Sequence, residues 1–120
     1  MKYLCMGYHD AKAWEAMTDG QRKAIQDESV AWGELLRKNG HCSGATGLRE
    51  SVSAATLRFE SSGAMSITDG PFAETKEQLG GVMVLEATDL NHAITLMSQM
   101  PCMRFGGSLE IRPINEELTF

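Results

Sequence analysis

The chain has 120 residues, of which 42% are apolar and 22% are charged. These proportions exclude a disordered polar chain, and the length predicts a single domain over residues 1–120 with one core. Sixteen Asp and Glu residues against eleven Lys and Arg leave a net charge of -5. Because a phosphate-backbone binder needs a basic surface, we expect no direct nucleic-acid partner.

Membrane and metal chemistry are also not expected. No apolar run approaches the roughly 20 residues that cross a bilayer, and the first residues lack a signal peptide's length and cleavage site, so the sequence predicts a cytoplasmic protein. Cys5, Cys42 and Cys102 are widely spaced and form no C-x-x-C arrangement. We therefore expect reduced thiols, with no disulfide framework, metal site or cofactor.

A strand over residues 3–8 and a helix over residues 19–38 open the predicted fold. Large apolar side chains fall at both odd and even positions of the strand, which is typical of a strand covered on both sides. Thr18 with Gln21 fits a capping box at the start of the helix, and Asn39-Gly40 fits its end. The apolar positions that this helix is expected to bury are Ile25, Trp32, Leu35 and Leu36.

Shorter elements are predicted around this helix. Residues 11–17 fit a short helical turn, and residues 41–48 fit an irregular strand whose glycines lack the spacing of a phosphate loop. Residues 54–60 alternate apolar and polar side chains and turn at Ser61-Ser62-Gly63 into residues 65–68. This pattern predicts a hairpin with one wetter face.

The last third of the chain predicts a strand, a helix and a closing strand. Residues 82–85 are continuously apolar, as expected of a central strand. Asp89 fits a helix N-cap, Pro101 fits the stop of that helix, and residues 108–113 alternate as a last strand. The buried stripe of the helix is expected at Leu90, Ala93, Ile94 and Met97.

This order of elements predicts an α+β fold, in which both helices cover one face of a largely antiparallel sheet. Several strands are apolar on both faces, yet 120 residues leave no third layer to cover the second face. An exposed apolar sheet of this size marks an interaction surface. The sequence therefore predicts a homodimer with two-fold symmetry, its two sheets packed face to face.

Residues 68–81 combine turn-forming residues, carboxylates and a lysine between two predicted strands. An aspartate in a turn commonly accepts a hydrogen bond from the backbone N–H two residues on, but Asp69 has Pro71 there, which has no N–H. Two interpretations remain open for Asp69. Its carboxylate accepts the N–H of Phe72 as in a helix cap, or it faces a ligand.

The charges that follow Asp69 suggest chemistry or a solvated surface. We expect a short helical turn through residues 74–77. Glu74, Lys76 and Glu77 form a charge cluster, which either faces water or turns inward beside Asp69. Paired carboxylates near a lysine perturb one another's proton affinity and suit acid–base work. His9, at the end of the first strand, is a second candidate proton carrier, and neither His41 nor His92 has a partner at metal-ligand spacing.

Residues 69–81, Asp-Gly-Pro-Phe-Ala-Glu-Thr-Lys-Glu-Gln-Leu-Gly-Gly, resemble the signature of the DGPF, or YCII-related, domain family. Residues 108–113 are similar to that family's closing strand. The resemblance implies a ferredoxin-like fold that dimerises into an α+β barrel, with a histidine and an aspartate in a cleft. The aspartate carries over to Asp69, whereas the histidine is either His9 or His41. Proteins similar to family members are encoded beside, or fused to, extracytoplasmic-function sigma factors, which implies a sigma factor as a partner.

The function predicted from the sequence is binding of a small polar molecule in a cleft near Asp69, with acid–base chemistry. Asp69 is the expected base or ligand acceptor, Glu74 and Lys76 set its charge environment, and His9 carries a second proton. The alternative is a non-catalytic regulatory module for an extracytoplasmic-function sigma factor. In a third interpretation the central stretch only stabilises the sheet and the dimer.

Overall fold

A computed structural model describes residues 1–118 of the chain. Its helices and strands alternate in the order that the sequence predicts. In chain order they are β1 (Lys2–Asp10), α1 (Ala11–Glu15), α2 (Asp19–Lys38), β2 (Cys42–Gly47), β3 (Ala55–Phe59), β4 (Met65–Asp69), β5 (Glu77–Glu86), α3 (Leu90–Met97) and β6 (Gly107–Pro113), with 3-10 turns at Ser51–Ser53, Pro101–Phe105 and Glu116–Leu118.

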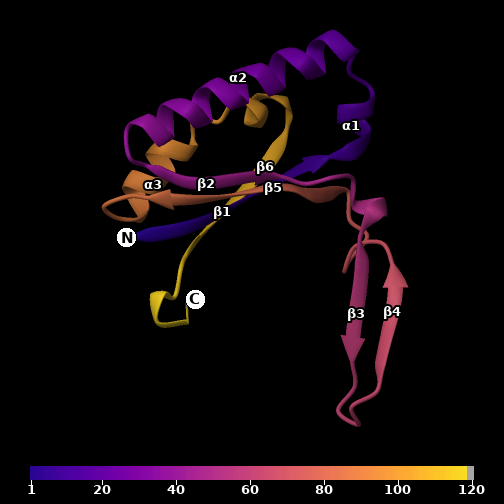
Figure 1. Ribbon diagram of the computed structural model, residues 1–120. Coiled ribbons are helices and arrows are strands. Elements are labelled where there is room, and N and C mark those ends of the chain that lie inside the picture. The colour runs from indigo at the N-terminus through magenta and orange to yellow at the C-terminus, as the bar shows by residue number, and fades with distance from the viewer. Residues whose placement is uncertain (119–120) are drawn as a thin grey trace.

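The main sheet has four strands in the order β2-β5-β1-β6, and each neighbouring pair is antiparallel. Helices α2 and α3 lie on one face of this sheet, as Figure 1 shows. This ferredoxin-like α+β arrangement confirms the predicted fold class. Strands β1 and β5 are central, which agrees with their apolar character on both faces.

The core lies between the sheet and the two helices. The least exposed side chains come from β1, β5 and α3, because the inward positions of the two strands face the helices. Leu35, Leu90 and Ile94 were expected to be buried but are exposed. The predicted apolar stripes were too wide, since each helix touches the sheet along a narrower line. The core cluster consists of Tyr3, Cys5, Leu36, Cys42, Met83, Leu85, Ala87, Ala93 and Met97.

The predicted helix ends are present. Thr18 Oγ1 accepts the N–H of Gln21 at 3.1 Å, and the Gln21 side chain accepts the N–H of Thr18 at 2.9 Å, which completes the capping box. Gly40 follows α2 with a φ of 79°, the left-handed conformation that glycine adopts without strain. Asp89 caps α3 by accepting the N–H of His92 at 2.8 Å. Local sequence therefore determines where both long helices begin.

The middle of the chain contains the predicted hairpin but not the predicted helical turn. Strands β3 and β4 form a separate two-stranded sheet that projects from the body, and they do not join the main sheet. Residues 74–77 form no helical turn. Strand β5 instead begins at Glu77 and is ten residues long, because Glu77 and Gln78 pair with Asp10 and His9 of an equally extended β1. Backbone pairing across the sheet outweighs the local turn signal.

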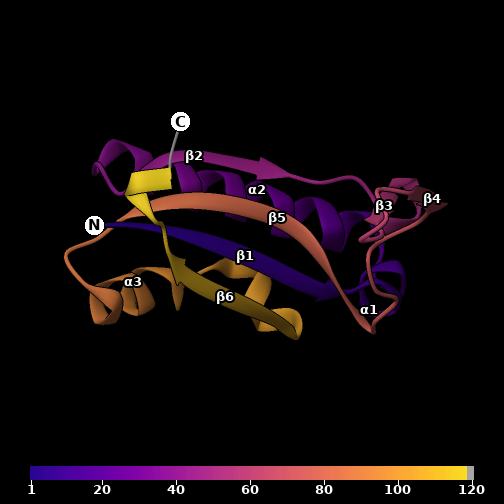
Figure 2. The same cartoon turned by 90° about the horizontal axis from the view of Figure 1, so that it is seen from below.

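The second face of the main sheet carries no α-helix, and only the C-terminal segment with its 3-10 turn at Glu116–Leu118 lies on that side (Figures 1 and 2). Leu4 and Met6 of β1 and Val82 and Val84 of β5 alternate with the core positions and therefore lie on this face. All four are partly exposed. Within residues 1–118, no helix is long and apolar enough to span a bilayer.

Candidate functional site

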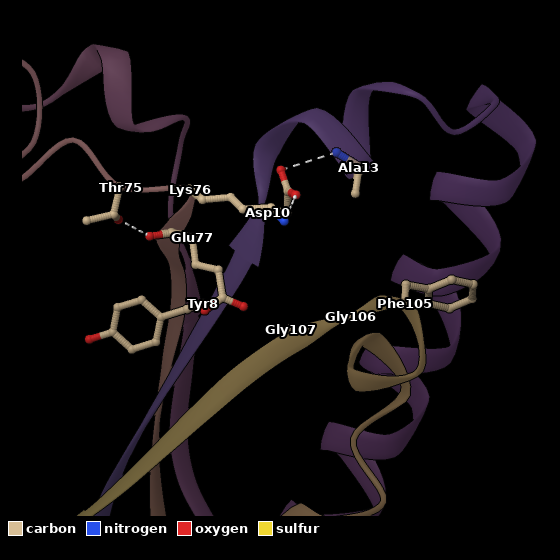
Figure 3. A pocket seen from close by; sticks show the side chains of 9 residues that line it. All are labelled: Tyr8, Asp10, Ala13, Thr75, Lys76, Glu77, Phe105, Gly106 and Gly107. Carbon is tan, nitrogen blue, oxygen red and sulfur yellow. Dashed lines mark hydrogen bonds and ion pairs between the residues drawn. The ribbon is translucent and has the colours of Figure 1, made fainter.

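A cavity of about 710 Å³ lies at the end of the main sheet where β1 finishes and β5 begins. Figure 3 shows its walls, which come from four places in the chain: the end of β1, helix α1, the segment that leads into β5, and the start of β6. Polar and charged side chains gather on one side of it. The lining residues are Tyr8, Asp10, Ala13, Thr75, Lys76, Glu77, Phe105, Gly106 and Gly107.

Asp10 is the most firmly positioned charged group of the cavity. It ends β1 and caps α1, so that its Oδ1 accepts the N–H groups of Lys12 at 3.0 Å and Ala13 at 3.4 Å. Its other oxygen, Oδ2, lies 3.8 Å from Nζ of Lys76. The Asp10 side chain is only 20% exposed, whereas that of Lys76 is 85% exposed. A largely buried carboxylate thus faces an exposed ammonium group.

Glu77 is the second ordered carboxylate. It stands opposite Asp10 in the β1–β5 ladder, and Ser108 Oγ donates to its two carboxylate oxygens at 3.1 and 3.0 Å. The preceding loop is fixed by side chains as well. Thr75 donates to the carbonyl oxygen of Glu77, and Gln78 Nε2 donates to the carbonyl oxygen of Thr75 at 2.7 Å. The segment that carries Lys76 is therefore anchored on both sides.

His9 lies next to this cavity in sequence but not among its lining residues. Consecutive residues of a strand point to opposite faces, so His9 points away from Tyr8 and Asp10. Its ring contacts Trp14 edge to face, with centroids 6.4 Å apart. A Cβ atom at Gly80 would lie 2.5 Å from His9 Nδ1, so the ring occupies space that only a glycine leaves open.

Asp69 ends β4, opposite Ala55 of β3, and is exposed. Within residues 1–118, its carboxylate accepts no hydrogen bond, and the N–H of Phe72 does not cap it. The backbone beside it is tied to β3, because Gly70 donates to the carbonyl oxygen of Ala54 at 2.6 Å and accepts from Thr56 Oγ1 at 2.9 Å. Gly70 has a φ of 100°, which requires glycine. Asp69 is thus held on the projecting hairpin.

The structure separates the four residues predicted for the site. Lys76 lines the cavity, whereas Asp69, Glu74 and His9 do not, and Glu74 is exposed in the loop between β4 and β5. Asp10 was missed, although an aspartate at the junction of a strand and a helix is a common cap. Its position beside Lys76 follows from the pairing of β1 with β5, which local sequence does not reveal.

The remaining histidines lie at the far end of β5 from the cavity. His41 and His92 contact each other edge to face, with ring centroids 5.3 Å apart. His92 Nδ1 accepts the N–H of Thr88 at 3.1 Å, so this nitrogen is already occupied. No group of three metal-ligating side chains occurs among the described residues.

The family model for the YCII-related domain matches residues 1–117. The chain belongs to the YCII-related family. This YCII-related chain is also 30% identical, over 115 residues, to an uncharacterized protein of Rhizobium meliloti (strain 1021), with 95% of this chain and 92% of that protein covered.

Among solved structures, this YCII-related chain is similar to 5-chloro-2-hydroxyhydroquinone dehydrochlorinase (TftG) from Burkholderia phenoliruptrix AC1100, in complex with 2,5-dihydroxybenzoquinone. The TM-score is 0.54 at 14% sequence identity, and the match covers 100% of both chains. At this identity the likeness shows a shared fold and nothing about chemistry. The signature of the family spans two places, since Asp69 to Phe72 lie at the hairpin and Thr75 to Glu77 lie at the cavity.

Proposed function

We propose that this YCII-related protein binds a small hydroxylated molecule in the cavity at the end of the sheet. The observation that carries this proposal is the pair formed by Asp10 Oδ2 and Lys76 Nζ, 3.8 Å apart on the cavity wall. A volume of about 710 Å³ lies in the range of pockets that hold drug-sized ligands, so a single substituted ring fits within it with room to spare.

The lining indicates the chemistry of the ligand. Asp10 and Glu77 are hydrogen-bond acceptors and suit hydroxyl groups, whereas Lys76 suits a carbonyl or anionic oxygen. Tyr8 and Phe105 provide two aromatic side chains, which favour a flat ring. A hydroxylated aromatic or quinonoid compound combines these features. The complex of the dehydrochlorinase with 2,5-dihydroxybenzoquinone makes that compound a sensible first probe.

Acid–base chemistry would follow from the geometry of Asp10. Two backbone N–H groups hold Oδ1, so Oδ2 remains available to accept a proton from a ligand hydroxyl. The nearby ammonium group of Lys76 would stabilise the oxyanion that forms. Four residues were predicted from the sequence to form the site, and only Lys76 has a role in the mechanism proposed here. The roles of Asp69, Glu74 and His9 stay predictions.

The test compares Asp10→Asn and Lys76→Met with Asp69→Asn and His9→Gln. Asparagine caps helices as well as aspartate does, so Asp10→Asn is expected to fold normally. Titration of 2,5-dihydroxybenzoquinone and simple hydroxybenzoates, followed by calorimetry, is expected to show at least a tenfold loss of affinity for the first two variants only. Equal affinity in Asp10→Asn and wild type, or a loss confined to Asp69→Asn, would refute this site. A sigma-factor complex, the alternative predicted from the sequence, would survive Asp10→Asn and Lys76→Met.

A further inference from the structure

Asp10 and Glu77 place two carboxylates on the same wall of the cavity. The two residues stand directly opposite each other in the β1–β5 ladder, and both line the cavity. Side chains of directly opposite residues share one face of a sheet, with Cβ atoms about 5 Å apart. The mechanism proposed above uses only Asp10, as a base beside Lys76. Glu77 is therefore a charged group of the cavity that still has no role in that mechanism.

The Glu77 carboxylate is oriented by a strand that does not pair with its own. Ser108 Oγ donates to the two carboxylate oxygens at 3.1 and 3.0 Å, and Ser108 belongs to β6. Strand β1 lies between β5 and β6, so the Glu77 side chain crosses over β1 to reach this hydroxyl. Ser108 stands opposite Tyr8, and Figure 3 shows the Glu77 carboxylate beside Tyr8. The carboxylate is thus directed along the cavity wall towards β6.

The Glu77 carboxylate keeps free acceptor positions in this orientation. A serine hydroxyl has one hydrogen to donate, whereas an ionised carboxylate has about four acceptor positions. Within residues 1–118, Ser108 is the one group that donates to the Glu77 carboxylate. Both oxygens can therefore accept a further hydrogen bond. Because a carboxylate accepts and does not donate, a ligand group that meets Glu77 has to be a donor.

The charges of the cavity also exclude some ligand groups from the side of Glu77. The charged lining residues are Asp10, Lys76 and Glu77, so one cation stands against two anions. The ammonium group of Lys76 lies 3.8 Å from Asp10 Oδ2. A carboxylate or phosphate group placed against Glu77 would meet a like charge, which lowers affinity. A hydroxyl group in the same place would donate a hydrogen bond.

The start of β6 leaves room for a ligand substituent beside Ser108. Gly106 and Gly107 line the cavity immediately before Ser108, and neither carries a side chain. Nothing lies within 4 Å of the Cβ position of Gly106, which has a φ of 79°. Glycine adopts this left-handed conformation without strain. The space next to the Glu77–Ser108 pair is therefore open to a ligand.

We propose that Glu77 determines the specificity of the cavity, which selects an aromatic ring with two hydroxyl groups over a ring with one hydroxyl and one carboxylate. This rests on the proposed function, in which Asp10 Oδ2 accepts the proton of the first hydroxyl. The second hydroxyl donates to Glu77, and Ser108 is the positioning residue that orients the carboxylate to accept it. A site that hydrogen-bonds a ligand hydroxyl discriminates against ligands that lack it.

The test uses three ligands that share one ring and differ in one substituent. Among catechol, resorcinol and hydroquinone, the isomer that binds wild type most tightly is compared with the methoxyphenol and the hydroxybenzoate of the same substitution pattern. The methoxy group keeps the oxygen but cannot donate, and the carboxylate adds a negative charge. Calorimetric titration of wild type is expected to show a preference of at least about tenfold for the diol over each of the other two.

Three variants show which group produces the preference. Glu77→Gln keeps the shape but can donate as well as accept, so both preferences are expected to fall below about threefold. Glu15→Gln removes the same charge from an exposed residue of α1 that does not line the cavity, and is expected to keep the wild-type preferences. Ser108→Ala keeps the charge of Glu77 but not its orientation, so only the preference over the methoxyphenol is expected to fall.

Each preference is a ratio of affinities within one protein, so a partial loss of folded protein does not change it. Equal preferences in wild type and Glu77→Gln, or the same loss in Glu15→Gln, would overturn the proposal. An unchanged preference over the methoxyphenol in Ser108→Ala would overturn the positioning role of Ser108.

The Asp10→Asn variant separates this proposal from the proposed function. If Asp10→Asn weakens binding of the diol while Glu77→Gln leaves the preferences unchanged, the cavity is the ligand site and Glu77 does not select the ligand. If Asp10→Asn binds the diol as tightly as wild type does, or if wild type binds none of the three diols, the proposed function fails together with the role of Glu77.

Discussion

Gly80 and His9 should be energetically coupled, because the His9 ring fills the space where a side chain at position 80 would begin. A Cβ atom at position 80 would lie 2.5 Å from His9 Nδ1 and 2.8 Å from its Cε1. Real Cβ atoms do not approach that closely, so Gly80→Ala must displace the ring from its contact with Trp14. Forcing an extra methyl group into a packed position costs about 1–3 kcal/mol.

The coupling can be measured with a double-mutant cycle in urea unfolding at one protein concentration. After the two His9 ring atoms, the next atom near the new methyl group is the backbone oxygen of Gly7, at 3.8 Å, so His9→Ala removes both close contacts. In that background Gly80→Ala is expected to be neutral or to stabilise the fold by about 0.4–1 kcal/mol, because alanine restricts the unfolded chain. A coupling free energy of at least about 1 kcal/mol is therefore expected.

Two outcomes of the cycle would contradict this account. If Gly80→Ala destabilises the wild type and the His9→Ala variant equally, the clash is with the backbone and not with the ring. If it is harmless in both, the His9 ring leaves its place beside Gly80 at negligible cost. Either result would remove the reason to regard His9 as held in one position.

Two other predictions concern stability. Gly33→Ala is expected to raise the free energy of unfolding by about 0.5–1 kcal/mol, because Gly33 lies inside α2 and nothing lies within 4 Å of its Cβ position; an unchanged or lower urea midpoint would contradict this. Burial, and secondarily the neighbouring Cys42, raises the pKa of Cys5 to about 11. The unfolded chain therefore loses this proton first, and stability should fall as the pH rises from 9 towards 11, by about 1 kcal/mol at pH 10. Unfolding from pH 8 to 10 should show a shallower decline in Cys5→Ala than in wild type, and equal slopes would refute the prediction.

Local sequence predicted the fold well, because each element carries its own signal. The capping box at Thr18 and the turn at Ser61-Ser62-Gly63 depend on neighbouring residues only, and both appear where expected. The alternation of apolar residues in β1 and β5 predicted a sheet with two apolar faces. The separate position of the hairpin was not predictable, since the same alternation suits a strand inside a sheet and a strand in a projecting hairpin.

The candidate site was predicted less completely for a related reason. Lys76 was selected from a charge cluster that is local in sequence, and it does line the cavity. Asp10 lies 66 positions away in the chain and reaches Lys76 only because β1 pairs with β5 as far as Glu77. We expected a helical turn at residues 74–77, and such a turn would have prevented Glu77 from pairing with Asp10. The role of Asp69 stays a prediction, and Asp69 lies at the end of β4 in the projecting hairpin.

Seven residues lie between Asp69 and Glu77 and connect the β3–β4 hairpin to the cavity. Their number affects how strand β5 pairs with β1, whatever their side chains are. Glu77 starts a ladder in which every residue of β5 except Gly80, where the register shifts, has a partner on β1. A strand that slips by one residue turns each of its side chains to the opposite face. If a single residue is inserted or deleted here, either the loop changes its path or β5 slips by one residue against β1. In the second case Glu77 would point to the face that Gln78 occupies now, and Gln78 to the face of Glu77. Libraries that vary the chemistry of this segment at constant length should yield folded proteins far more often than libraries that vary its length.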